Sequence, residues 1–370
     1  MDLKRILFLA FAYRASANML QTSVPLYARY TLKLSDGATS ILVTLSNVIA
    51  VFSFLLLISF RRDLKKALCV CFLLMCAGTS LILFARSFLA LFLCFALANL
   101  GSAPLQSLLF TSTVFASKKE TSFKNVSLFT SALSLSLVLG PLYQALVLRL
   151  FQNNLLLSML SFLPFTLCAL IVCLFTHLHT TASFEFGKID FLRDKAYITA
   201  LLVEAMYALP FVALLTFGGI FLKERFSVSL SLVELLYSLF FVTSFLTRFA
   251  LSKFAQKRFA LVTFSTFLTI FSLVALSFSQ NLFITSFLFV LLGFPHGVTY
   301  PLSSSYVAES VKKERLTFAS SLSQSFFGVT SFLVIPFVGY VGEIFGLGFA
   351  FLLLTPFIFA LYLGFCLLNS

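Results

Sequence analysis

Twelve unbroken apolar runs of about 20–27 residues fill almost the whole chain, and this feature most constrains the fold. At 1.5 Å per residue, a helix of that length crosses the hydrocarbon core of a bilayer, whereas the strands of a membrane barrel alternate over about ten residues. The chain is 60% hydrophobic and 11% charged, against about 25% charged in soluble domains. We therefore predict an all-α integral membrane protein. The predicted spans are 6–28, 37–60, 67–85, 88–114, 126–149, 155–176, 196–222, 229–251, 259–279, 282–308, 316–341 and 344–368.

The basic residues form small clusters in alternate loops. Of the 26 Lys and Arg residues, 19 fall on one side of the predicted membrane, six fall on the other, and Arg14 lies within the first span. Because basic loops stay in the cytoplasm, both termini and the central loop are expected there, in a multi-pass protein of the plasma membrane. The net charge of +13 is spread over these clusters and forms no continuous basic face, so nucleic acid is not an expected partner.

The two halves of the chain repeat each other at an offset of about 190–195 residues. The loop Arg61–Lys66 recurs near Ser252–Arg258, the sequence from Lys118 to Thr121 recurs from Lys312 to Arg315, and Gly140-Pro141 recurs at Ile335-Pro336. Six spans per half predict a parallel repeat, as in two-bundle transporters. The predicted units are an N-terminal bundle of residues 1–176, a cytoplasmic loop of residues 177–195 and a C-terminal bundle of residues 196–370.

The segment Glu309–Leu353 resembles the tenth-loop to twelfth-helix region of the major facilitator superfamily, with its basic loop, Pro336 and Gly339. Gly140-Pro141 matches the core of that family's fifth-helix motif. Of the family's loop between helices two and three, only the basic end is present, as Lys65 and Lys66, and Asp63 is out of register. The resemblance implies twelve helices in two pseudo-symmetric bundles, alternating access, and gating roles for the motif residues.

Polar residues interrupt four of the apolar spans at helical spacing, which places them on one face of each helix. They are Arg14, Asn18 and Gln21; Asn99, Ser102 and Gln106; Glu204 and Tyr207; and His296, Tyr300 and Ser303. The resemblance implies that these four helices, the first, fourth, seventh and tenth, line a central substrate cavity. The alternative is that each group only forms a hydrogen bond between helices, which stabilises the fold by about 0.6 kcal/mol.

Arg14 and Glu204 are the charged members of this set. Their separation of 190 residues matches the repeat offset, so we expect them at equivalent depths on opposite sides of the cavity. Burial favours a protonated Glu204, a nearby guanidinium favours the carboxylate, and Arg14 itself stays charged. The pair is therefore predicted to couple transport to a proton, and a permanent structural ion pair is the alternative. Glu234 is expected near the outer end of its helix, in contact with water.

The sequence contains few residues from which a catalytic centre could be formed. There are three His residues, no Asp-rich diphosphate motif, no phosphate-binding glycine loop and no spaced metal ligands, so we expect no enzyme, no cofactor and no metal site. The seven Cys lie inside apolar runs, where packing explains them. A channel would need a ring of carbonyls or charges around a pore. A channel and a membrane-embedded enzyme remain as rival classes.

The sequence thus favours a monomeric secondary transporter whose partners are the bilayer, a small-molecule substrate and H⁺. With no ATP-binding motif, an ion gradient or facilitated diffusion would drive it. The apolar lining favours proton-coupled efflux of small amphipathic or drug-like compounds. Uptake or facilitated diffusion of a sugar or carboxylate is the alternative, and it would be expected to need a more polar or cationic lining.

Overall fold

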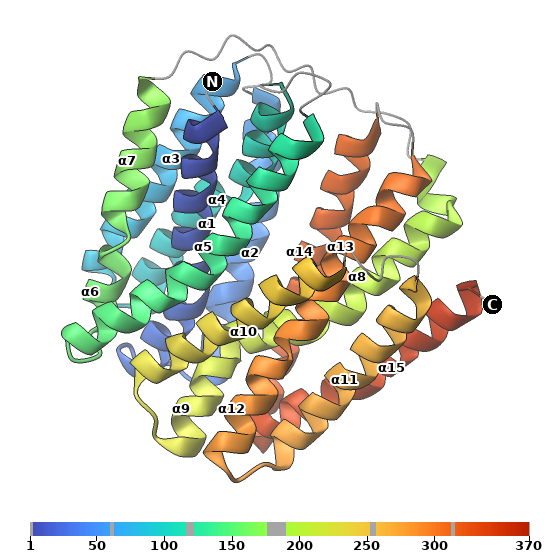
Figure 1. Cartoon of the computed structure of the whole chain (residues 1–370). Helices are drawn as coiled ribbons and strands as arrows, with labels where there is room; N and C mark the ends of the chain where they lie inside the picture. Colours follow the sequence, from blue (N-terminus) through green and yellow to red (C-terminus); the bar gives the residue numbers. More distant parts are fainter. Residues whose placement is uncertain are drawn as a thin grey trace. The chain divides into compact units, whose positions relative to one another are not determined.

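The computed structural model describes residues 3–59, 63–115, 122–175, 190–251, 257–311 and 315–369, and the regular elements in these ranges are helices (Figure 1). They group into two compact units. Unit 1 comprises Met1–Leu34, Ile41–Phe184 and Ser229–Ser238, and unit 2 comprises Ser35–Ser40, Glu185–Val228 and Leu239–Ser370. Each unit is described by itself, and the boundaries predicted for the two bundles stay predictions.

Unit 1 is built from long apolar helices. They are α1 (Leu3–Tyr30), α2 (Asp36–Ser59) beyond its first turn, α3 (Leu64–Leu81) with the 3₁₀ turn η1 (Ile82–Phe84), α4 (Phe88–Phe115), α5 (Ser122–Leu150), α6 (Leu155–Leu160), α7 (Leu163–Leu174) and the first part of α10 (Leu230–Leu251). The predicted span 155–176 is broken between α6 and α7. Pro164 stands in the first turn of α7, where its missing N–H is tolerated.

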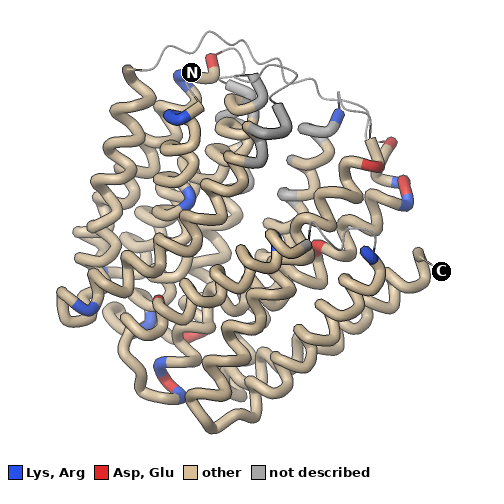
Figure 2. The backbone as a smooth tube through the Cα atoms, in the orientation of Figure 1, with Lys and Arg blue, Asp and Glu red and all other residues tan. Residues whose placement is uncertain are grey.

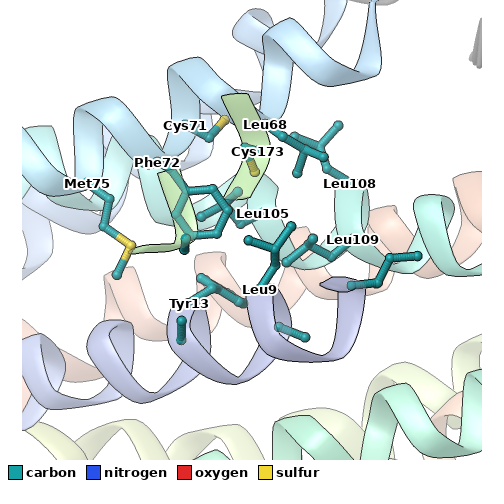
Figure 3. Packing of buried hydrophobic residues seen from close by; sticks show 14 of the residues in the cluster. Leu9, Tyr13, Leu68, Cys71, Phe72, Met75, Leu105, Leu108, Leu109 and Cys173 are labelled. Carbon is teal, nitrogen blue, oxygen red and sulfur yellow. The ribbon is translucent and has the colours of Figure 1, made fainter. Parts of the chain in front are cut away.

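The core of unit 1 lies where α1, α3, α4 and α7 meet (Figure 3). Leu9 of α1, Phe72 of α3 and Leu105 of α4 are fully buried there. The α3 and α4 backbones approach closely at two glycines: a Cβ on Gly78 would lie 2.6 Å from the Cys94 carbonyl oxygen, and one on Gly101 would lie 2.7 Å from the Met75 nitrogen. Small residues allow such contacts in membranes, where packing replaces the hydrophobic effect between helices.

Unit 2 has the same kind of construction. Its elements are η3 (Asp190–Arg193), α8 (Lys195–Ala213), the π-helical turn η4 (Leu214–Gly218), α9 (Gly219–Phe226), the rest of α10, α11 (Arg258–Phe278), α12 (Leu282–Leu291), α13 (Gly293–Ser310), α14 (Leu316–Phe345) and α15 (Leu347–Asn369). The Asp194 side chain caps α8 by accepting from the backbone N–H groups of Ala196 and Tyr197. The π-helical turn follows Pro210, which cannot donate a backbone hydrogen bond within α8.

The predicted all-helical membrane fold with twelve spans is confirmed. Each predicted span corresponds to one helix or to consecutive helices, and ten helical segments of the described chain are long and apolar enough to cross a membrane. The other two are α1, which carries Lys4, Arg5 and Arg14, and α2, whose qualifying apolar part, Asp36–Ala50, is shorter. Spans 196–222 and 282–308 contain breaks that hydropathy does not reveal, at η4 and at Leu292.

Charged residues gather toward the ends of the helices within the described ranges (Figure 2). Ion pairs at these ends include Arg258–Glu309 at 2.5 Å and Arg315–Asp190 at 2.8 Å. Part of the basic set that predicts the topology lies outside the described residues. That part is Arg61, Arg62, Lys118, Lys119, Lys188, Lys253, Lys312 and Lys313, and the same holds for His177, His179 and most of the predicted central loop.

Candidate functional site

Glu204 of α8 lies in a buried polar cluster of unit 2. The residue is 6% exposed. Its Oε2 atom accepts hydrogen bonds from the Ser303 hydroxyl of α13, at 3.3 Å, and from the Ser323 hydroxyl of α14. Ser303 Oγ also lies 3.1 Å from the Ala200 carbonyl oxygen. Within the described part of the chain the carboxyl has no ion-pair partner, so only neutral groups contact it.

A second cluster of unit 2 surrounds His296 of α13, which is 4% exposed. Four aromatic rings enclose the imidazole: the centroids of Tyr207 and Phe211 lie 4.9 and 4.6 Å away, and those of Phe240 and Phe241 lie 5.5 and 5.6 Å away. The rings come from α8 and α10. They hold the imidazole plane in place.

Two polar side chains of α10 meet the same nitrogen of this imidazole. His296 Nδ1 lies 2.7 Å from Ser244 Oγ and 3.2 Å from Arg248 Nη2. The Arg248 guanidinium also lies over the Tyr300 ring, 5.7 Å from its centroid, which is cation–π distance. Because Tyr300 is 38% exposed, the cluster runs from a closed aromatic box to a more open cationic end.

The structure thus brings together, in unit 2, two pairs of the polar residues singled out in the sequence, Glu204 with Ser303 and Tyr207 with His296. Sequence reasoning missed Ser323 and Ser244, because a serine in an apolar span has no distinctive signal. It also gave Arg248 no role in a site, because Arg248 was counted only among the basic residues of one side of the membrane. The helix α10 extends to Leu251, so Arg248 lies within it and packs on His296 and Tyr300. Its position inside the predicted span 229–251 was the available signal.

Unit 1 holds the other predicted cavity residues. Asn18 of α1 is 1% exposed, and Asn99 of α4 donates through Nδ2 to Asn47 Oδ1 at 3.4 Å. Ser102 is buried beside Asn99, and its hydroxyl lies 3.4 Å from the Asn99 carbonyl oxygen. Arg14, Gln21 and Gln106 are partly exposed. That residues of both units share one cavity stays a prediction.

The motif residues include two glycines in different surroundings. A Cβ on Gly339 of α14 would overlap the Ser40 side chain and lie 2.8 Å from the Asp36 carbonyl oxygen, so only glycine fits. A Cβ on Gly140 of α5 would meet Ala15 at 3.4 Å, an ordinary contact. The two motif prolines, Pro141 and Pro336, lie inside α5 and α14.

Lys65 and Lys66 lie in the first turn of α3, whose N-cap is Asp63. The Asp63 carboxylate accepts from the Lys66 backbone N–H at 2.9 Å and lies 3.3 Å from Lys66 Nζ. The backbone hydrogen bond from Lys66 is the main cause that holds the pKa of Asp63 below its ordinary value. Asp63 therefore acts as a helix cap at this position.

Residues 196–369 match the family model described as Major Facilitator Superfamily, and the whole chain has the fold of such transporters. The C-terminal part of this chain is thus similar to the Major Facilitator Superfamily. The fold is that of a multi-pass membrane protein, as the sequence predicts.

Three solved structures illustrate the likeness of fold. A bacterial homologue of the human lysosomal transporter Spinster, inward-facing and occupied, is 14% identical over 99% of this chain and 96% of its own, with a TM-score of 0.83. The nucleoside transporter NupG is 14% identical over 100% of both chains, with a TM-score of 0.75. A POT family transporter bound to a thioalcohol-conjugated peptide is 11% identical over 99% and 96%, with a TM-score of 0.80. A comparison with curated proteins gives no match.

Proposed function

We propose that this protein is a secondary active transporter of the Major Facilitator Superfamily. It expels small amphipathic compounds in exchange for protons, by alternating access, and Glu204 is the proton-binding residue. The observation that carries the proposal is the set of Glu204 contacts: a buried carboxyl that touches only neutral hydroxyls in the described chain. A permanent carboxylate there would be costly, whereas a group that gains and loses a proton can use this environment.

The two serines can serve both protonation states of Glu204. A hydroxyl has one proton to donate and lone pairs that accept. When the carboxyl is ionised, Ser303 donates to Glu204 Oε2. When it is protonated, Ser303 can donate to the Ala200 carbonyl oxygen at 3.1 Å and accept the carboxyl proton instead. The cluster therefore supports proton binding and release without an unsatisfied buried group.

The aromatic box around His296 supports an amphipathic substrate class. Phe327 of α14 adds a further ring at 6.4 Å from Tyr207, so apolar walls adjoin the Arg248 guanidinium and the Tyr300 ring. A substrate with an aromatic or apolar body and one polar group suits such walls. The Arg248 charge favours a second candidate function, uptake of a small carboxylate, because a guanidinium is a good partner for that group.

Three further properties belong to the proposal. Arg14, which lies in unit 1, is the fixed positive charge that sets the proton affinity of Glu204 during transport. The protein acts as a monomer in the plasma membrane with both termini in the cytoplasm. Asn18, Gln21, Asn99, Gln106, Tyr207, His296 and Tyr300 contribute to the substrate cavity.

The test has two stages. Purified protein is first melted with ethidium, uridine or benzoate, because a compound that binds the native state raises the melting temperature by mass action. The stabilising compound is then used in proteoliposomes with wild-type protein, Glu204→Gln and, as a matched control, Glu309→Gln at an exposed helix end. We expect Glu204→Gln to lose transport driven by a pH gradient and to keep exchange at equal pH. Gradient-driven transport that persists in Glu204→Gln, or loss of both activities together with folded protein, would exclude Glu204 as the coupling residue.

A further inference from the structure

Glu234 of α10, in unit 1, is a buried acidic residue that no function described so far uses. Its exposure is 0%, so the expectation that it meets water at the outer end of its helix is wrong. The reason lies in its neighbours along α10. Ser231 donates to the Ala145 carbonyl oxygen at 2.7 Å, and Ser238 donates to that of Val138 at 2.9 Å. Because Glu234 stands three residues after one and four before the other, it lies on the same helix face, which α5 covers.

The polar side chains of α1 and α5 in this part of unit 1 are neutral. Thr22 of α1 lies next to the carboxyl without forming a hydrogen bond of good geometry with it. Asn18 lies one turn before Thr22 on α1, and Ser23 is joined to Gln144 of α5 by a short hydrogen bond. Tyr237, the neighbouring titratable side chain along α10, is also buried. No ion pair reaches Glu234 from the residues that the structure describes.

Several buried polar atoms in this region are unsatisfied within the described chain. Both amide atoms of Asn18, Oε1 of Gln144 and both carboxyl oxygens of Glu234 lack a hydrogen-bond partner of good geometry. Asn18 and Gln144 are 1% and 0% exposed. Buried polar groups are nearly always hydrogen-bonded, so a cluster of exceptions needs an explanation. A bound proton is one, because it turns an acceptor-only carboxylate into a donor.

The hydrogen bonds of Thr22 within its own helix limit what its hydroxyl can offer to Glu234. The Thr22 hydroxyl donates to its own helix, where the Met19 carbonyl oxygen lies at 3.2 Å and that of Asn18 at 3.4 Å. A hydroxyl has a single proton, so Thr22 can offer Glu234 only a lone pair. A carboxylate gains no hydrogen bond from Thr22 in this arrangement, whereas a protonated Glu234 can donate to Thr22 Oγ1.

We propose that Glu234 is a second proton-binding carboxyl of this protein, protonated in this structure and separate from Glu204. One proton from water adds to one carboxylate oxygen, and the resulting O–H donates to Thr22 Oγ1. Loss of that proton would leave an unpaired carboxylate against α1 and α5. Proton release therefore requires Ser229–Ser238 to lose its contacts with these helices, so the protonation of Glu234 and this packing are linked.

The test uses dicyclohexylcarbodiimide and needs no transported substrate. The reagent reacts with protonated carboxyls in apolar surroundings. The carboxyl oxygen bonds to the carbodiimide carbon, and the acid proton moves to a carbodiimide nitrogen. The adduct then rearranges to a stable N-acylurea. Peptide mass spectrometry then locates the adduct. At neutral pH, where an ordinary Glu is ionised, we expect modification of Glu234 and none of the exposed control Glu309. Glu234→Gln, which resembles the protonated acid in shape, should lose only the adduct at position 234.

Infrared spectroscopy gives a second measurement that does not depend on reagent access. The difference spectrum between wild type and Glu234→Gln at neutral pH should contain the carbonyl stretch of a protonated carboxyl. Thr22→Val should move that band to higher frequency, because the acceptor of the carboxyl proton is gone. A difference spectrum with a carboxylate band in place of the carbonyl band would overturn the proposal. So would a carbonyl band that sodium chloride removes and choline chloride does not, since the site would then bind Na⁺.

The same measurements separate this proposal from the role proposed for Glu204. In the Glu204→Gln background the Glu234 adduct and band should persist unchanged. If Glu204→Gln keeps gradient-driven transport, the proposed function fails and the Glu234 signals still decide the second site. If the Glu234 carbonyl band is missing from wild type, the second site fails and the transport assay of Glu204→Gln is unaffected.

Discussion

Arg248 Nη2 lies 3.2 Å from His296 Nδ1, and this contact determines which imidazole nitrogen carries the proton. A guanidinium has donors only, so Nδ1 must accept, and the proton of the neutral imidazole lies on Nε2. Arg248 also lies over Tyr300. A single arginine therefore orients the histidine of the aromatic box and forms the cationic end of the cluster.

We expect Arg248→Gln to lower the melting temperature of the purified protein, because it removes both the donor to His296 and the cation over Tyr300. In a double-mutant cycle with His296→Leu, the coupling between the two residues should be about 0.5–3 kcal/mol. Arg315→Gln, at an exposed helix end, serves as the control and should have little effect. Additive effects of the two substitutions would show that the Arg248–His296 contact is absent in solution.

The donors to Glu204 can be tested one at a time. Ser323→Ala removes a hydrogen bond from a buried carboxyl and should destabilise the protein by about 1–3 kcal/mol. Ser331→Ala, in the same helix, is the matched control because, within the described part of the chain, the Ser331 hydroxyl donates to the Phe327 carbonyl oxygen of its own helix. Thermal melting of the two variants should differ clearly. Equal melting temperatures would contradict the Ser323–Glu204 hydrogen bond.

Substitution by alanine should affect stability differently at the two motif glycines. Gly339→Ala places a methyl group against Ser40 and the Asp36 carbonyl oxygen, so α2 must shift, at a cost of about 1–3 kcal/mol. Gly140→Ala makes an ordinary contact with Ala15 and should keep the wild-type melting temperature. If Gly339→Ala is as stable as Gly140→Ala, the close approach of α2 and α14 does not exist.

The exposed pair of Asp190 and Arg315 predicts a small pH dependence. The hydrogen bond from Arg315 holds the pKa of Asp190 below its ordinary value. Such a carboxyl stabilises the folded state at pH values above its unfolded pKa, and this contribution is lost as the pH falls through the lower folded pKa. In Arg315→Gln the pKa of Asp190 should rise toward the ordinary value, as carbon NMR of labelled aspartate can measure. An unchanged pKa would contradict the pair.

The topology is tested by reporter fusions. Fusions at Thr31, Gln152 and Asn281 should report the outside, and a fusion at Ser183 should report the cytoplasm, because basic loops remain inside. Thr31 lies at the end of α1, Gln152 lies between α5 and α6, and Asn281 caps α12. Two reversed assignments would contradict both the count of twelve spans and the parallel repeat.

The sequence by itself determined the twelve membrane helices, since the length and apolarity of a span are local properties of the chain. It also identified Glu204 and His296, because a charged or titratable side chain inside an apolar run stands out without any partner. The breaks at η4 and Leu292 were harder to predict, since proline is common in membrane helices and bends only some of them.

The partners of these residues were decided only by the tertiary structure. Ser323 is one of many serines in its span, and it matters because α14 brings it to Glu204. Arg248 had no predicted contact until α10 placed it on His296, and Glu234 was expected to meet water until α5 covered it. Hydropathy indicates which segments of the chain lie in the membrane. Which helix face meets which neighbour depends on packing between segments far apart in the sequence, and a single sequence does not record it.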